Sequence, residues 1–131
     1  MTLPRRLHAA GLVPDEVEAL MVAQLSDLDL AVPPPEGVQL VPVVDAGGVE
    51  ALVRVHDRVF GGDHRATGRD LLAGLTHQPR PVEAVVAMAG ATPVAAGRVN
   101  FHEGTDFASP WGGGTTPAWR GRGVFRSLVS R

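Results

Sequence analysis

The sequence contains no cysteine, no lysine and no tyrosine. Without cysteine it can form neither disulfides nor cysteine-based metal sites, and it has no cysteine nucleophile. Without lysine the ATP- and GTP-binding motif G-x-x-x-x-G-K-[ST] cannot occur, and neither glycine cluster completes the dinucleotide-binding motif G-x-G-x-x-G. The five histidines show no metal-ligand spacing, so we expect no metal site.

Strong charge and long apolar runs are also missing. The formal net charge is -2 over 131 residues, of which 44% are hydrophobic, so we expect one domain and no nucleic-acid partner. No apolar run approaches the ~20 residues of a membrane span. The N-terminus is a poor signal peptide because Pro14, Asp15 and Glu16 end its short apolar run. We therefore expect a cytoplasmic protein without membrane contact.

The first 37 residues differ in composition from the rest. Residues 4–10 favour a short helix closed by Gly11, and the β-branched content of residues 17–23 favours a strand. Three prolines at 33–35 then mark an extended linker. We accordingly divide the chain into an N-terminal segment with a proline-rich linker, residues 1–37, and a domain over residues 38–131.

The domain opens with one strand and two helices. Residues 38–44 predict the strand, and Pro42, which lacks an N–H group, favours a position at a sheet edge. A helix capped by Asp45 follows, and its apolar face consists of Val49, Leu52, Val53, His56, Val59 and Phe60, where the histidine is interpreted as a core or boundary residue. A capping box that starts at Thr67 begins a second helix, which Pro79 prevents from continuing.

The second half of the domain predicts three strands and a last helix. Residues 82–89 and 93–101 read as a hairpin that turns near Gly90 and buries one face. A glycine-rich strand over about residues 107–116 follows, and a helix starts near Gly123. The expected order of elements is therefore β-α-α-β-β-β-α.

The segment from Gly112 to Arg126, GGGTTPAWRGRGVFR, carries the strongest functional signal. Consecutive glycines in a strand mark a place where another group approaches the backbone closely. The Arg-Gly-Arg-Gly run lets successive N–H groups converge at a helix N-terminus, where partial positive charge favours an anion. The last fifteen residues add four arginines and no acid. We interpret this segment as a phosphate or pyrophosphate site; a solvated loop and a small RNA contact are the alternatives.

The run from Arg120 to Phe125 resembles the acetyl-CoA signature R/Q-x-x-G-x-G/A of the GNAT N-acetyltransferases, and Thr115 to Trp119 resembles its lead-in of strand, proline and aromatic residue. Arg120 and Gly123 match the signature, whereas Phe125 replaces its final small residue. The expected order of elements in the domain is also that of the family. The resemblance implies a partial GNAT fold of the α/β (α+β) class, with a mixed, mainly antiparallel sheet and helices on both faces.

By this resemblance the protein transfers an acetyl group from acetyl-CoA, its cosubstrate, to an amine of a small molecule or peptide. The implied cofactor-binding residues are Gly114, Thr115, Arg120, Gly121, Arg122, Gly123, Val124 and Phe125. The fourth strand would pair its backbone with the pantetheine amides and polarise the thioester carbonyl. In some members the general base lies near Ser109; Asp106 and Glu103 are the nearest carboxylates, and each also suits a turn.

The family's usual general acid is a tyrosine on a helix after a fifth strand. This sequence has no tyrosine and ends at Arg131, early in the preceding helix. We therefore expect a C-terminally truncated member of the family whose domain is incomplete and which is inactive by itself. The alternative function is a non-catalytic acyl-CoA-binding fragment.

Overall fold

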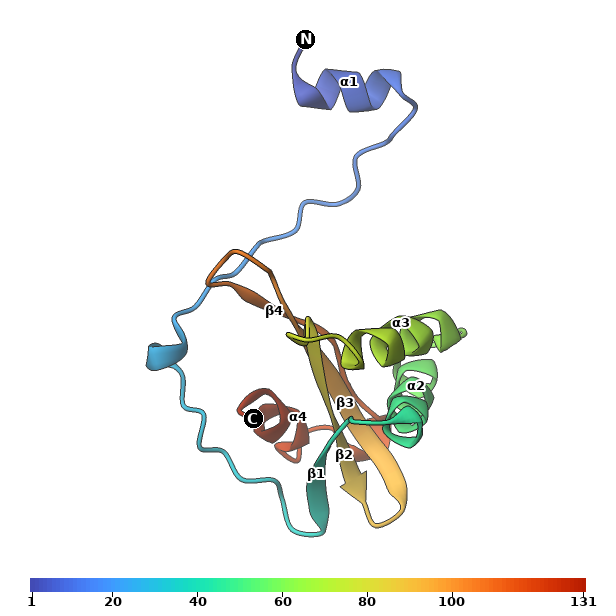
Figure 1. Cartoon of the computed structure of the whole chain (residues 1–131), viewed down its shortest axis with the longest axis vertical. Helices are drawn as coiled ribbons and strands as arrows, with labels where there is room; N and C mark the ends of the chain where they lie inside the picture. Colours follow the sequence, from blue (N-terminus) through green and yellow to red (C-terminus); the bar gives the residue numbers. More distant parts are fainter.

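A four-stranded antiparallel sheet organises the chain, all 131 residues of which are described in this computed structural model (Figure 1). Its strands are β1 (Val38–Pro42), β2 (Val82–Ala89), β3 (Thr92–Phe101) and β4 (Ala108–Thr115), which lie side by side in chain order. Each strand pairs antiparallel with the next. The predicted hairpin is confirmed as β2 and β3, and β1, which contains Pro42, lies at the predicted edge.

Helices cover both faces of this sheet, as predicted. Helices α2 (Ala46–Phe60) and α3 (Arg65–Leu75) lie on one face and α4 (Val124–Val129) on the other (Figure 1). The predicted cap of α2 is confirmed, because the Asp45 carboxylate accepts a hydrogen bond from the Gly48 N–H at 2.9 Å. Helix α4 begins directly after Gly123, also as predicted.

The predicted capping box at Thr67 is wrong, because α3 already begins at Arg65 and Thr67 lies inside it. The start of α3 is held by carboxylates that precede it. Asp57, near the end of α2, accepts a hydrogen bond from the His64 N–H at 2.9 Å, and Asp63 accepts one from the Arg65 N–H at 2.9 Å. The turn between the helices, rather than a box within α3, therefore sets where α3 starts.

Two separate cores form on the two faces of the sheet. The first, which we call the α2/α3 core, holds eleven buried residues, namely Val43, Val49, Ala51, Leu52, Val55, Leu71, Leu75, Val82, Ala84, Val86 and Ala96. The second, the α4 core, holds six, namely Val38, Ala87, Val94, Ala95, Val124 and Leu128. The sheet is therefore covered more extensively on its α2/α3 face.

The N-terminal segment extends away from the sheet (Figure 1). It contains α1 (Leu3–Ala9) and the short 3-10 helix η1 (Leu25–Asp27), and none of the residues in these helices is buried. The strand predicted over residues 17–23 is wrong: these residues form no strand and are all exposed. A strand needs a partner for its backbone, and this segment has none.

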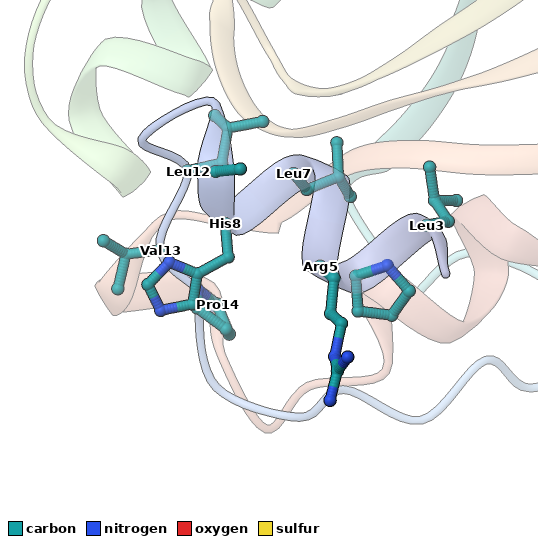
Figure 2. A pocket seen from close by; sticks show the side chains of 9 residues that line it. Leu3, Arg5, Leu7, His8, Leu12, Val13 and Pro14 are labelled. Atoms are coloured by element: carbon teal, nitrogen blue, oxygen red, sulfur yellow. The ribbon is translucent and has the colours of Figure 1, made fainter. Parts of the chain in front are cut away.

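A hollow lies beside α1 (Figure 2). Its lining comes only from residues 3–14, including Leu3, Leu7 and Leu12, so the short segment forms it by folding back on itself. It contacts neither core of the domain. None of the helices has both the length and the apolar character that crossing a membrane requires.

Candidate functional site

The predicted cofactor-binding residues lie together in one continuous stretch at the end of β4. Gly114 and Thr115 end the strand, the 3-10 helix η2 (Pro117–Trp119) follows, and a turn over residues 120–123 leads into α4. Gly121 and Gly123 have φ angles of 72° and 80°, which residues with a side chain rarely adopt. The two glycines therefore allow the chain to turn sharply between β4 and α4.

This turn presents backbone N–H groups without partners. No backbone hydrogen bond within the chain begins at the N–H of Gly121, Arg122 or Gly123, and no side chain caps α4. The first helical bond runs from the Ser127 N–H to the Gly123 carbonyl at 3.0 Å. A Cβ added at Gly121 or Gly123 would meet no atom within 4 Å, so the turn is open to solvent. Free donors at an open turn suit an anion such as pyrophosphate.

Two arginines of this turn contact residues that precede it in the chain. The Arg120 Nε donates a hydrogen bond to the Thr115 carbonyl at 3.0 Å, which ties the turn back to the end of β4. The Arg122 guanidinium lies 4.9 Å from the centre of the Trp119 ring, a favourable cation–π arrangement. The Thr115 hydroxyl is buried without a hydrogen-bond partner. The turn therefore carries two positive charges, and both arginines connect it to the residues that precede it.

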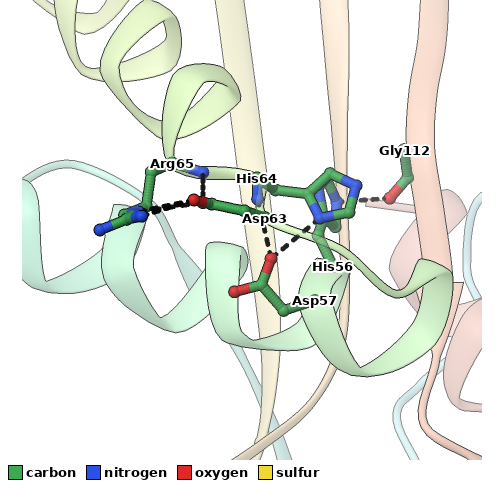
Figure 3. Close-up of polar contacts among 6 residues, drawn as sticks. All are labelled: His56, Asp57, Asp63, His64, Arg65 and Gly112. Atoms are coloured by element: carbon green, nitrogen blue, oxygen red, sulfur yellow. Dashed lines mark hydrogen bonds and ion pairs between the residues drawn. The ribbon is translucent and has the colours of Figure 1, made fainter.

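A buried histidine contacts β4 just before this turn. The pairing of β3 with β4 shifts its register near Gly112, whose φ is 61°. The His56 Nε2 lies 2.8 Å from the Gly112 carbonyl oxygen (Figure 3). His56 is only 2% exposed, and this burial lowers its pKa. The ring is therefore neutral at pH 7, and Nε2 carries the hydrogen that it donates. The interpretation of His56 as a core residue is confirmed.

Carboxylates hold the turn between α2 and α3 beside His56 (Figure 3). The His64 ring, whose centre lies 5.5 Å from that of His56, donates from Nδ1 to Asp57 at 2.9 Å. This hydrogen bond, together with one from the His64 N–H, lowers the pKa of Asp57. Hydrogen bonds from Arg65 lower the pKa of Asp63 to about 2. Both carboxylates are therefore ionised at neutral pH and fix the turn against α2.

The predicted catalytic carboxylates lie elsewhere. Glu103 and Asp106 are exposed in the turn between β3 and β4. That turn is at the opposite end of β4 from Gly121, and a strand of this length spans about 25 Å. The structure therefore does not bring these two carboxylates to the glycine-rich turn.

Sequence reasoning missed a polar cluster near the start of β4. The Ser109 hydroxyl lies 2.8 Å from the His102 Nε2 and accepts a hydrogen bond from the Trp111 Nε1 at 2.7 Å. Ser109 and Trp111 are two apart on β4 and so share a face, which is the one signal the sequence offered. No group of three or more histidine, aspartate or glutamate side chains is placed to hold a metal ion.

Solved structures with a similar fold include acetyltransferases. The similarity to a GCN5-related N-acetyltransferase from Kribbella flavida has a TM-score of 0.59 at 20% identity and covers 82% of this chain and 38% of that one. A protein from Pyrococcus horikoshii described as an acetyltransferase has a TM-score of 0.57 at 20% identity, with 76% of this chain and 36% of that one covered. AAC(6')-Iy, solved with the bisubstrate analogue CoA-S-monomethyl-acetylneamine, has a TM-score of 0.55 at 18% identity, with 71% and 67% covered.

No protein-family model and no curated protein sequence matches the chain. The chain spans little more than a third of the length of the Kribbella and Pyrococcus proteins. At these identities the similarity concerns the fold, and it includes the sheet with helices on both faces. The chain therefore has the fold of the GCN5-related N-acetyltransferases, over the part that these structures share with it.

Proposed function

We propose that this chain contains the acyl-CoA-binding part of an N-acetyltransferase that transfers an acetyl group from acetyl-CoA to an amine. The observation that carries the proposal is the run of free N–H groups at Gly121, Arg122 and Gly123, which continues into the first turn of α4. The fold that the chain shares with solved N-acetyltransferases supports the proposal.

In this proposal the turn receives the pyrophosphate of CoA. The free N–H groups of residues 121–126 donate to its oxygens, and the end of the helix adds about 0.3 to 1 kcal/mol for each favourable charge. Arg122 and the remaining arginines of the last fifteen residues add a positive field that no acid in that stretch opposes. Gly121 and Gly123 keep side chains out of the space that the anion needs.

The end of β4 then receives the pantetheine arm. β4 pairs with β3 along one edge only, so its other edge has backbone groups free to pair with amides. Acetyl-CoA supplies the thioester carbonyl that the amine attacks, and a β4 N–H group orients and polarises it. Gly114 and Thr115 are the residues of β4 that lie nearest the turn.

The proton of the attacking amine requires a base on this chain or in solvent. Asp106 and Glu103 remain the proposed carboxylates, and this role requires the arm to carry the thioester along β4 toward the turn between β3 and β4 in which they lie. The acceptor is a small-molecule or peptide amine in this proposal. AAC(6')-Iy, whose solved complex contains an acetylneamine joined to CoA, gives an example of a small amine handled by this fold.

Calorimetric titration of the full chain with CoA tests the proposal. Gly121→Val and Gly123→Val each put a branched side chain where the backbone has a positive φ and where the anion would lie. We expect each substitution to weaken CoA binding at least about tenfold, a loss of about 1.4 kcal/mol.

The matched control is Gly90→Val in the turn between β2 and β3. Gly90 also has a positive φ of 59° and open space around its Cβ position, but it lies outside the glycine-rich turn. It should therefore bear similar backbone strain and leave the affinity for CoA unchanged. Equal affinity for CoA in all three variants and the unsubstituted chain would remove the assignment of this turn to CoA. A thiol-release assay with acetyl-CoA and a panel of amines then distinguishes a chain that catalyses acetyl transfer from one that only binds CoA.

A further inference from the structure

Ser109, His102 and Trp111 form a chain of polar contacts near the start of β4, which we call the Ser109 cluster. The Trp111 Nε1 donates a hydrogen bond to the Ser109 Oγ at 2.7 Å, and the His102 Nε2 lies 2.8 Å from the same oxygen. Because an indole N–H only donates, Ser109 accepts from Trp111 and keeps its own hydrogen for another acceptor. A neutral imidazole with its hydrogen on Nδ1 supplies that acceptor at Nε2.

The turn between β3 and β4 holds His102 in place. The His102 carbonyl accepts hydrogen bonds from the Thr105 N–H at 3.1 Å and from the Thr105 hydroxyl at 2.9 Å. The His102 N–H donates to the Phe107 carbonyl at 3.2 Å. These three bonds fix the backbone from which the imidazole projects toward Ser109.

Small molecules in solution can reach this cluster. His102 is exposed, Ser109 is half-buried and Trp111 is 55% exposed. The hydroxyls of the other three serines bond to carboxylate or carbonyl oxygens, so Ser109 is the serine with its hydroxyl beside an imidazole. A hydroxyl within hydrogen-bond reach of such a base is the arrangement that activates serine for attack on a carbonyl carbon.

Two more polar side chains lie across the sheet from this cluster. Asn100 is the β3 residue directly opposite Ser109, and Arg98 is the one opposite Trp111. Residues directly opposite each other in an antiparallel pair project from the same face, with Cβ atoms about 5 Å apart. Both side chains carry N–H groups, the type of donor that stabilises the negative oxygen formed when a carbonyl is attacked. The surroundings of Ser109 therefore suit attack on an ester or thioester.

We propose that Ser109 is an acyl-accepting nucleophile for activated acyl esters and thioesters, with His102 as its general base. The Ser109 Oγ bonds to the carbonyl carbon while its proton moves to the His102 Nε2. The bond from that carbon to the leaving oxygen or sulfur then breaks, and the leaving group departs with the electron pair. The proton passes from the imidazolium to the leaving group or to water. Ser109 then carries the acyl group as an ester, and His102 is neutral again.

Incubation of the full chain with 4-nitrophenyl acetate tests this inference. Nitrophenolate release gives the rate, and mass spectrometry of peptides after an acid quench locates the acetyl group. We expect one acetyl group on Ser109 of the unsubstituted chain and none at this position in Ser109→Ala. His102→Gln keeps a side chain that can accept a hydrogen bond from Ser109 but is not basic. It should slow acetylation about a hundredfold, the lower end of what a general base contributes.

The matched controls are a serine and a histidine outside the cluster. The Ser26 hydroxyl donates to the Asp27 carboxylate at 3.3 Å, and the His77 Nδ1 lies 2.9 Å from the Ala73 carbonyl oxygen. Both residues are exposed, so Ser26→Ala and His77→Gln remove the same chemical groups without changing the cluster. Neither should change the rate at which Ser109 is acetylated. Circular dichroism verifies that each variant is folded.

Two results would overturn the inference. One is the absence of an acetyl ester on Ser109 together with equal nitrophenolate release by the unsubstituted chain and Ser109→Ala. The other is acetylation of Ser109 at an unchanged rate in His102→Gln, because the imidazole would then only hold the turn. If the ester hydrolyses before the quench, slower release by both variants still supports the inference. The probe contains neither phosphate nor pantetheine, so each of these outcomes leaves the proposed binding of CoA at the glycine-rich turn as it is.

Discussion

The two faces of the sheet differ in how extensively helices cover them. On one face, α2 and α3 close a core of eleven buried residues, and the buried Gly114 of β4 lies against Val59, which packs on that core. On the other face, α4 is six residues long and closes a core of six, and Gly113 meets an exposed ring. The more extensive packing on the α2/α3 face is therefore expected to constrain β4 more than the packing on the α4 face does.

The difference between the two faces can be tested most strongly by removing a large side chain from each core. Leu52 of the α2/α3 core is 0% exposed and Leu128 of the α4 core is 8% exposed. Leu52→Ala should lower the free energy of unfolding by about 3 to 4 kcal/mol and Leu128→Ala by about 2 kcal/mol, because a less enclosed site leaves a smaller cavity. Urea unfolding measures both, and a larger loss for Leu128→Ala would reverse the proposed ranking of the two faces.

Two adjacent glycines of β4 sharpen the same comparison. Gly114→Ala forces a methyl group against Val59 and Phe60 and should cost about 1 to 3 kcal/mol of unfolding free energy, as overpacking does. Gly113→Ala meets only the Phe125 ring, which can move aside, and should cost less than about 0.5 kcal/mol, the range of surface changes. The pair shares strand, residue type and substitution, so equal losses in thermal unfolding would show that the two faces constrain β4 alike.

The pH dependence of stability tests whether His56 fixes β4 from the packed face. Burial holds its pKa below the ordinary value for histidine of about 6.5. Its contribution to stability is therefore fully present above that value and is lost as the pH falls through the lowered pKa, because the unfolded chain takes up the proton more readily.

Between pH 7.5 and pH 5.5 the unsubstituted chain should become less stable, and His56→Gln should flatten this slope. Asp57 and Asp63 stay ionised over this range, since their pKa values are lowered from those of ordinary carboxylates. His77→Gln is the control because it removes an exposed imidazole and should leave the slope in place. An unchanged slope in His56→Gln would mean that another group, and not this buried ring, senses the pH.

The smallest effect is expected for the N-terminal segment. Residues 1–30 are all exposed, and just after them the Val32 carbonyl accepts a hydrogen bond from Ser130 Oγ at 3.2 Å. Deleting residues 1–30 should change the free energy of unfolding by less than about 0.5 kcal/mol and leave CoA affinity unchanged. A drop in melting temperature of several degrees would instead place this segment against the domain in solution.

Prediction from the sequence succeeded where residues close together in the chain determine the local structure. The apolar spacing from Val49 to Phe60 gave the correct helix, Asp45 gave the correct cap, and the turn glycines gave the correct hairpin and the start of α4. It failed over residues 17–23 because β-branched residues favour a strand only when another strand supplies hydrogen bonds. It failed at Thr67 because Asp57 of α2 and Asp63 of the following turn accept the backbone hydrogen bonds at residues 64 and 65, where the helix begins.

The sequence by itself determined the order of elements and the donor-rich turn after β4, because periodicity, turn glycines and helix ends act over a few residues. Only the tertiary structure decided which residues meet across the sheet. His56 bonds to a carbonyl 56 positions away, and the Phe125 ring comes to rest on Gly113. Such contacts depend on strand register and on how each helix lies over the sheet, which the packing of the whole domain sets and no local pattern encodes.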